Sequence, residues 1–216
     1  LMEKYSAPRA ITRSLELAWV HAQLELRLLR IQPDDARRFQ QLAGAMLYPN
    51  AWLRPPSERL EQNRLGQSGL WPYGISGDFP IAVVSIGEAR DLSTVRQMLQ
   101  AHTFWRQHGL KTDLVILNEE ASSYEQPLNE RLLRLIETNS IYTATDQPGG
   151  VYLRSVDQIP EEHLSLILSV ARVVLVAARG PLSQQLGVPR DALDLPADLV
   201  TRRIQEEPSA PLPFME

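Results

Sequence analysis

Two predicted buried strands, separated by a segment long enough for a helix, constrain the fold of this chain more than any other feature. The first is the continuous apolar run Ile81–Ile86, and the second is Asp113–Leu117, in which four apolar residues follow the aspartate; both are typical of strands buried on both faces. Between them, Ser93 to His108 is predicted to be helical, with Gly109 ending the helix. Strand, crossover helix and strand form a βαβ unit, whose strands are parallel and whose crossover is right-handed. The chain is therefore predicted to have an α/β fold.

The region downstream continues the same alternation. A helix is expected near Gln126 to Glu137, and Val151–Arg154 is expected to form a third strand. Ile141–Thr145 competes for that role and remains an alternative. A further helix is predicted from Pro160 to about Ala178. We therefore expect residues 81–188 to form a small three-layer α/β unit with a mostly parallel sheet of about three strands.

Residues 1–47 are predicted to form a helical hairpin. The first helix, Ala10–Arg30, carries apolar residues at three- and four-residue spacing, and further leucines lie on the flanking positions. A helix that is apolar over so much of its surface is expected to be packed on two sides. The second helix is expected from Asp35 to about Leu47, because Asp34 and Asp35 suit the positive N-terminal end of a helix.

Two segments lack clear periodicity. Residues 48–80 are rich in glycine, proline and asparagine and are predicted to be a long loop, with a short helix around Ser57 to Asn63. A loop of this length in a compact domain is often functional. Residues 189–216 contain five prolines and are predicted to be an extended connector.

Composition and charge argue against several kinds of site. Lysine and arginine number 22 against 26 acidic residues, so a basic nucleic-acid surface is not expected. The chain has no cysteine, and its four histidines lack the spacing of metal ligands. The best apolar run, Leu164–Ala178, contains Arg172 and is too short to cross a bilayer. We therefore predict no metal, no cofactor, no nucleic-acid partner and no direct membrane insertion, and we expect the fragment to be soluble.

Polar side chains follow the first two strands at their carboxyl ends, where open α/β sheets form ligand sites. These side chains are Glu88, Asn118 and Glu119. The turn after the first strand has one glycine, Gly87, where a dinucleotide fingerprint needs three, and Glu88 would repel a pyrophosphate. The alternative hypothesis is therefore a standalone small α/β enzyme, or a ligand-binding domain, with its site at these strand ends. A cleft there would favour it, whereas a filled surface would favour a non-catalytic module.

The densest cluster of distinctive residues lies in the long loop, just before the first strand. It contains Trp71, Tyr73 and Asp78 in a glycine-rich stretch. An aromatic ring can stack on the apolar face of a sugar while polar groups bind its hydroxyls, so these residues are candidate glycan contacts. The alternative, which we favour because buried aromatic residues usually serve packing, is that Trp71 and Tyr73 anchor the loop to the core.

The same cluster carries a family resemblance. The segment Arg64–Ile81, RLGQSGLWPYGISGDFPI, resembles bacterial cyclic β-1,2-glucan synthases, in their long C-terminal region related to cellobiose phosphorylase. Ala101–Leu110, which leads into Asp113–Glu119, and Leu42–Pro49 show the same resemblance. Pro208–Phe214 resembles the connector that precedes a β-sandwich repeat in these enzymes.

The resemblance implies a module between β-sandwich repeats of a much larger enzyme. That parent is expected to combine glycosyltransferase and glycoside-phosphorylase-like activities on the cytoplasmic side of the bacterial inner membrane. The family's transferase part needs Asp-x-Asp pairs and a membrane channel, and its phosphorylase-like part places its acid on an (α/α) barrel. This chain has no Asp-x-Asp sequence, and its α/β pattern does not form such a barrel, so no catalytic residue carries over. The leading hypothesis is a non-catalytic structural or glycan-contacting module, whose partners are neighbouring domains and β-1,2-glucan.

Overall fold

The computed structural model describes residues 8–121, 127–139 and 144–187. The helices are α2 (Pro8–Leu28), α3 (Pro33–Leu47), α4 (Ser57–Gln62), α5 (Leu92–Gln107), α6 (Pro127–Asn139), α7 (Glu161–Val170) and α8 (Leu182–Gln185). The strands are β1 (Ile81–Ile86), β2 (Asp113–Asn118), β3 (Val151–Ser155) and β4 (Val173–Val176). Short 3₁₀ helices are η1 (Ala51–Leu53), η2 (Gln67–Tyr73), η3 (Ala89–Asp91), η5 (Val156–Gln158) and η6 (Ala177–Arg179).

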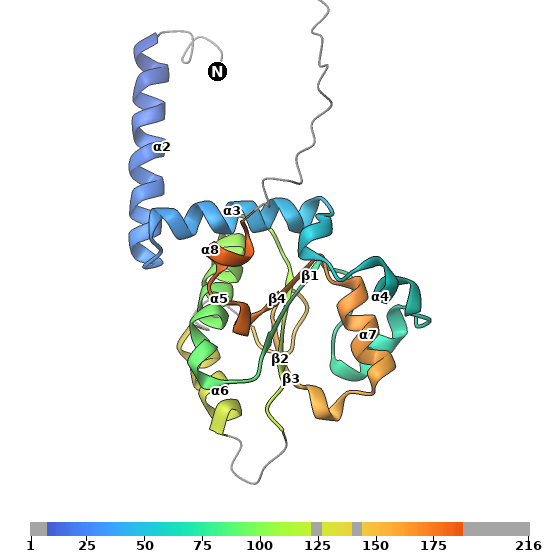
Figure 1. Cartoon of the computed structure of the whole chain (residues 1–216). Helices are drawn as coiled ribbons and strands as arrows, with labels where there is room; N and C mark the ends of the chain where they lie inside the picture. Colours follow the sequence, from blue (N-terminus) through green and yellow to red (C-terminus); the bar gives the residue numbers. More distant parts are fainter. Residues whose placement is uncertain (1–7, 122–126, 140–143, 188–216) are drawn as a thin grey trace, which may run out of the picture.

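The described strands form one parallel sheet in the order β3-β2-β1-β4 (Figure 1). In this register Val83 of β1 lies opposite Val115 of β2 and Val174 of β4, and Val115 lies opposite Tyr152 of β3. The predicted α/β fold with a parallel sheet is therefore confirmed. The sheet has four strands, close to the expected three.

The additional strand, β4, lies where the sequence predicted a continuous helix from Pro160 to Ala178. That expectation is wrong in its second half, because α7 ends at Val170 and β4 begins at Val173. The backbone N–H of Arg172 donates to the carbonyl of Ile81 at 2.8 Å, which brings the chain alongside β1. The central strand is thereby paired on both edges.

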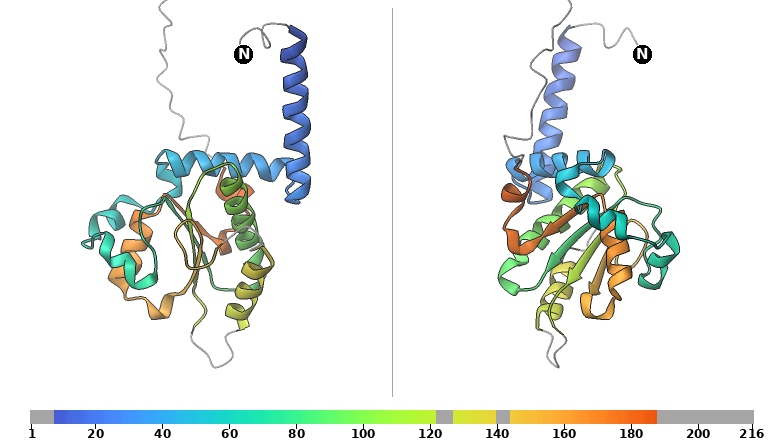
Figure 2. Two further views of the ribbon diagram at one scale, coloured as in Figure 1. Left: turned by 180° about the vertical axis from the view of Figure 1, so that it is seen from behind. Right: turned by 45° about the vertical axis from the view of Figure 1, so that its right-hand side comes forward.

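Helices cover both faces of the sheet, giving the expected three layers (Figures 1 and 2). On one face α3, α5 and α6 pack on Ala82, Val84 and Ile116, and on the other α7 and η2 pack on Val83 and Val115. The first two strands were predicted to be buried on both faces, and six of their apolar residues are at most 2% exposed: Ala82, Val84, Ile86, Leu114, Ile116 and Leu117.

The two N-terminal helices differ in how they relate to this unit. In α3, Phe39, Leu42 and Met46 are buried in the core, and Trp105 of α5 donates its indole N–H to the carbonyl of Phe39 at 2.8 Å. By contrast, α2 stands away from the α/β unit, and most of its apolar side chains are exposed (Figures 1 and 2). The expectation that this helix is packed on two sides is therefore not met within the described residues.

The region between α3 and β1 contains more local structure than a long loop. The short helix expected around Ser57 is present as α4, and η1 and η2 flank it. The predicted connector, residues 189–216, lies outside the described residues. So does most of the alternative strand Ile141–Thr145, of which Thr145 makes an isolated bridge with Val151.

Candidate functional site

The loop that carries the aromatic candidates is fixed by neighbours of those candidates. Leu70 and Ile75 are buried, at 2% and 0% exposed, against the face of the sheet that α7 covers. Trp71, between them in sequence, is 62% exposed. The expectation that Trp71 anchors the loop is therefore wrong, because the turn of η2 directs Leu70 into the core and leaves the indole in solvent.

Tyr73 does serve as an anchor. Its hydroxyl is hydrogen-bonded to Nδ1 of His163 at 3.1 Å, and the two rings meet edge to face. Its carbonyl accepts from Nε and Nη2 of Arg154 at 3.1 and 2.5 Å. Burial, together with the Glu162 carboxylate, raises the pKa of Tyr73. Gly74 then ends the 3₁₀ helix with a left-handed conformation, φ 71°, that suits glycine.

Asp78 lies apart from the aromatic pair. Its backbone N–H donates to Oγ of Ser76 at 3.2 Å, and its carboxylate accepts from Nε2 of Gln67 at 3.4 Å. It lines a hollow of ≈ 490 Å³ between η2 and α7, next to Phe79 and Arg172. Neither Trp71 nor Tyr73 lines this hollow. The structure therefore does not bring the three candidates together around one cavity.

The alternative residues at the strand ends make local contacts. The side chain of Asn118 is buried and accepts the backbone N–H of Glu120 at 2.9 Å. Glu88 pairs with Arg90 at 2.9 Å on the surface. The carboxylate of Glu119 lies over Gly87, 3.8 Å from where a Cβ would stand. None of the three lines the hollow between η2 and α7 or the grooves beside α2.

The sheet order also places a topological switch between β1 and β4, where open α/β sheets commonly bind ligands. Here the segment η6–α8 fills that position. The hydroxyl of Thr94 donates to the carbonyl of Gly180, and the backbone N–H of Leu182 donates to Oε1 of Gln97, both at 3.1 Å. Leu182 is fully buried. The carboxyl edge is thus occupied by the protein's own side chains.

Buried ionisable groups cluster at the opposite edge, where β2 begins. Asp113 accepts the backbone N–H of Gly149 at 2.6 Å, while its second oxygen has no partner among the described residues. Burial raises the pKa of this carboxyl, the bond from Gly149 opposes the shift, and Asp78 adds to it. His102 donates from Nε2 to the carbonyl of Thr112 at 2.8 Å, and burial lowers its pKa. The bond from Gly149 to Asp113 holds the turn before β3, where a Cβ on Gly150 would collide with the carbonyl oxygen of Ala144.

A second exposed aromatic pair was not predicted from the sequence. Tyr48 and Trp52 are 76% and 63% exposed at the end of α3 and in η1. Asn50 accepts the backbone N–H of Trp52 at 3.0 Å, and Leu53 is buried, so this turn is also fixed. The only signal available was two aromatic residues interspersed with prolines.

Two further kinds of feature were sought among the described residues: a metal site and a membrane-spanning helix. No group of three or more His, Asp or Glu side chains there is arranged to hold a metal ion. None of the described helices has the length and hydropathy needed to cross a membrane.

The fold and the filled strand ends define a small parallel α/β unit with fixed, solvent-exposed aromatic side chains. Over 186 residues, 86% of the chain, it is 33% identical to the cyclic beta-(1,2)-glucan synthase NdvB of Rhizobium meliloti (strain 1021). The resemblance to the cyclic β-1,2-glucan synthases is thereby confirmed. The match spans 7% of that protein's length. No family model matches the chain.

Proposed function

We propose that the chain is a non-catalytic module of a protein related to the cyclic β-1,2-glucan synthases, and that it contacts both glucan and neighbouring domains. The similarity to NdvB over 86% of the chain supports the relationship. The parent is a larger glycosyltransferase-like and glycoside-phosphorylase-like enzyme, held at the cytoplasmic side of the bacterial inner membrane.

One observation carries the non-catalytic assignment. At the carboxyl edge of the sheet, the switch position between β1 and β4 is filled by η6 and α8, and Asn118 serves a backbone turn. A substrate at this edge would have to displace buried groups such as Leu182. This arrangement favours the module over the alternative of a standalone enzyme or ligand-binding domain at Glu88, Asn118 and Glu119.

Glycan contact is assigned to Trp71. Its indole is 62% exposed. The backbone around it is held in place by the buried side chains of Leu70 and Ile75 and by the hydrogen bond between Tyr73 and His163. A fixed ring loses little conformational entropy when a sugar stacks on it. Tyr73 and Asp78 contribute to this role by holding the loop.

Calorimetry with linear β-1,2-glucan tests this assignment. We expect Trp71→Ala to weaken binding at least tenfold, and Trp52→Ala, a matched change at a ring that is 63% exposed, to alter it less than twofold. The free energy of unfolding of both variants should lie within about 0.5 kcal/mol of that of the unmutated chain, because both rings lie on the surface. Equal losses of glucan affinity in the two variants, or no binding by the unmutated chain, would contradict the glycan role of Trp71.

A further inference from the structure

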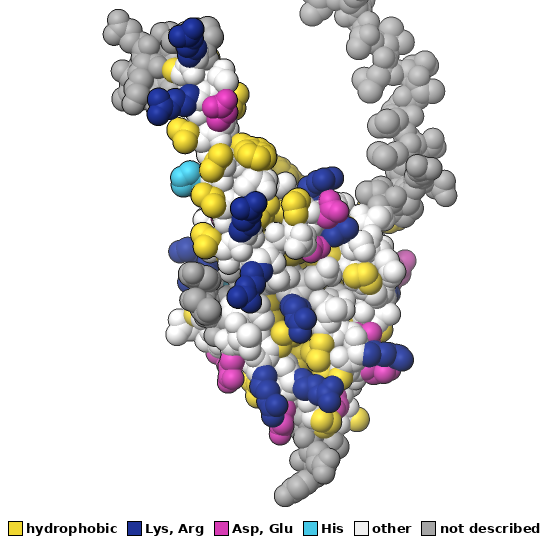
Figure 3. Space-filling view, turned by 90° about the vertical axis from the view of Figure 1, so that its left-hand side faces the viewer, with side chains coloured by type: hydrophobic (Ala, Val, Ile, Leu, Met, Phe, Trp, Pro, Cys, Tyr) yellow, Lys and Arg dark blue, Asp and Glu magenta, His cyan; other side chains and the backbone are white. Residues whose placement is uncertain are grey.

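Helix α2 exposes an unusual amount of apolar surface. Of the thirteen large hydrophobic side chains that are exposed in the described residues, seven lie on this one helix. They are Ile11, Leu15, Leu17, Trp19, Val20, Leu24 and Leu28. Apolar side chains gather along this helix in Figure 3. A contiguous exposed patch of this kind marks an interaction site more often than scattered single residues do.

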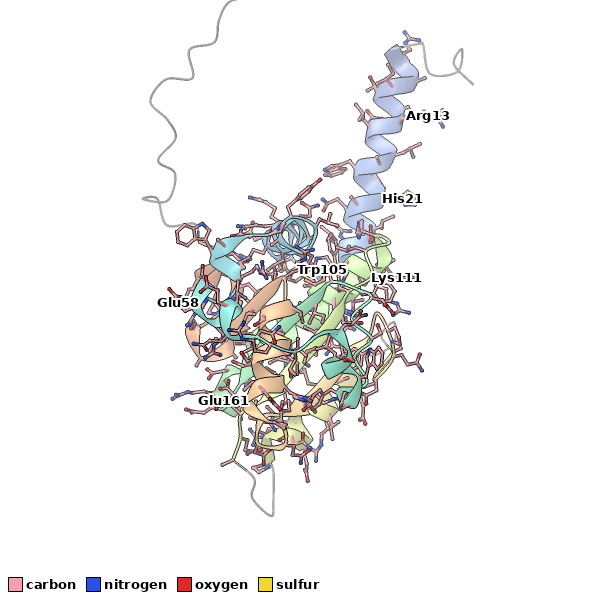
Figure 4. The ribbon with its side chains drawn as sticks, turned by 90° about the vertical axis from the view of Figure 1, so that its right-hand side faces the viewer. Arg13, His21, Glu58, Trp105, Lys111 and Glu161 are labelled. Atoms are coloured by element: carbon pink, nitrogen blue, oxygen red, sulfur yellow. The ribbon has the colours of Figure 1, made fainter. Side chains whose placement is uncertain are left out.

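The apolar side chains of α2 form two stripes. At about 100° per residue, Ile11, Leu15 and Trp19 share one side of the helix, and Leu17, Leu24 and Leu28 lie nearly opposite. Polar and charged residues such as Glu16, Gln23 and Glu25 lie between the stripes. Arg13 and His21, which project from the helix in Figure 4, lie within and beside the second stripe. A helix with two opposed apolar stripes buries both only between two surfaces.

One stripe continues directly from the core of the molecule. Leu26 and Leu29, which follow the line of Leu15 and Trp19, pack against the core cluster that contains Phe39 and Trp105. The rest of the stripe extends beyond the α/β unit into solvent. A helix without tertiary packing is only marginally stable in water, so most of α2 lacks the contacts that normally maintain a helix.

The C-terminal end of α2 borders a groove of ≈ 730 Å³ between α5 and α6. Its lining combines leucines, such as Leu28 and Leu135, with four arginines and contains no carboxylate. The arginines are Arg30, Arg96, Arg131 and Arg134. Of these four, Arg134 pairs with Glu130 at 3.3 Å on the surface of α6. Apolar and basic side chains lie next to one another on this face of the molecule (Figure 3).

We propose that α2 and this groove form the docking surface for another folded body in the same, longer polypeptide. That body packs apolar side chains on both sides of α2 and presents carboxylates to the arginines of the groove. The inference rests on the proposed function, in which the chain is one module of a larger protein. The match covers 7% of the relative's length, so a protein of that kind has a large amount of further chain from which the docking partner could come.

A second copy of this chain fits the observations less well. A twofold-symmetric pair would place one stripe of α2 against its counterpart and leave the opposed stripe in water. Such a pair would also place the arginine-rich grooves of the two copies at one interface, where neither groove supplies carboxylates to the other. A covalently linked neighbour meets α2 at a high effective concentration and has no such symmetry constraint.

Site-specific photocrosslinking in the full-length protein tests the proposal. A benzophenone amino acid replaces Leu15 in one variant and Leu24 in another, which places a probe on each stripe. Glu58, on the exposed helix α4, is the control position (Figure 4). We expect both stripe probes to form crosslinks, identified by mass spectrometry, to peptides outside residues 1–216 of the same molecule. The Glu58 probe should give at most a fifth of that yield.

Mixing ¹⁴N- and ¹⁵N-labelled protein separates the outcomes. Crosslinks of mixed isotope composition would show a second copy and overturn the proposal, as would stripe yields no higher than the yield at Glu58. Replacing Arg96 and Arg131 together by glutamate should lower the crosslinking yield at least threefold. The calorimetric test of Trp71 is independent, so failed docking and failed glycan contact give different results.

Discussion

At the scale of single residues, the centre of the sheet tolerates the least change. Val115 lies between Val83 and Tyr152 in the parallel register and has no exposed surface. Both strand neighbours are equally buried, so a polar group at this position has no access to water. The second core cluster therefore depends on an apolar side chain here.

Val115→Asp should lower the free energy of unfolding by several kcal/mol, because it places an unpaired charge in a two-sided core. Urea denaturation followed by circular dichroism measures the change. Leu133→Asp, at a residue of α6 that is 43% exposed, is the matched control and should cost less than about 1 kcal/mol. Similar losses in the two variants would contradict the assigned sheet.

Asp113→Asn tests the buried carboxyl at the start of β2. The pKa of Asp113 is raised in the folded protein, so folding favours its protonated form, and its contribution to stability is lost as pH rises through that pKa. Asparagine keeps an oxygen for the N–H of Gly149 and removes the charge. We expect the variant to melt at or above the wild-type temperature at pH 7, with the difference shrinking as pH falls toward 4. A variant that melts lower at pH 7 but equally at pH 4 would show that the charged carboxylate stabilises the fold.

The site residues show how far sequence reasoning reaches at this scale. The loop was found because aromatic and glycine residues are concentrated in it, and Tyr73 does anchor it, as expected. Trp71 was assigned the wrong environment, because a glycine-rich stretch does not reveal which of two adjacent side chains, Leu70 or Trp71, a 3₁₀ turn directs inward. That choice depends on the position of α7, which lies about ninety residues later in the chain.

At the scale of elements, β1, β2 and α5 were predicted within one residue of their observed bounds, because each shows a strong local pattern. The missed strand, β4, shows the limit of this reasoning. It is separated from α7 by Ala171 and Arg172 alone, with neither glycine nor proline to mark the break. Three valines in Val173–Val176 were the available signal, and only pairing with β1 makes them a strand.

Removing residues 1–22 tests whether α2 contributes to the stability of the α/β unit. The deletion retains Leu26 and Leu29, which reach the core, and removes side chains that are mostly exposed. We expect the free energy of unfolding, measured in urea, to change by less than about 1 kcal/mol. A loss of more than about 2 kcal/mol would mean that α2 belongs to the folding unit.

At the scale of the whole molecule, the purified chain should turn over neither UDP-glucose nor β-1,2-glucan. The physical reason is the filled carboxyl edge, where Thr94, Gly180 and Leu182 occupy the switch position of the sheet. Release of UDP, and of glucose 1-phosphate in the presence of phosphate, are the measurements. Turnover that is abolished by Glu119→Gln would show that the strand-end alternative is correct.

The order of the strands also has a consequence for biosynthesis. Helix α3, with its buried Phe39 and Met46, packs beside β4, the last strand in the described residues to leave the ribosome. At about 5–20 residues per second, roughly ten seconds separate the synthesis of these two elements. During that interval α3 can already pack on α5, whereas the edge of β1 that later pairs with β4 stays open. Until Val173–Val176 emerges, the unpaired backbone groups of that edge can bind another strand.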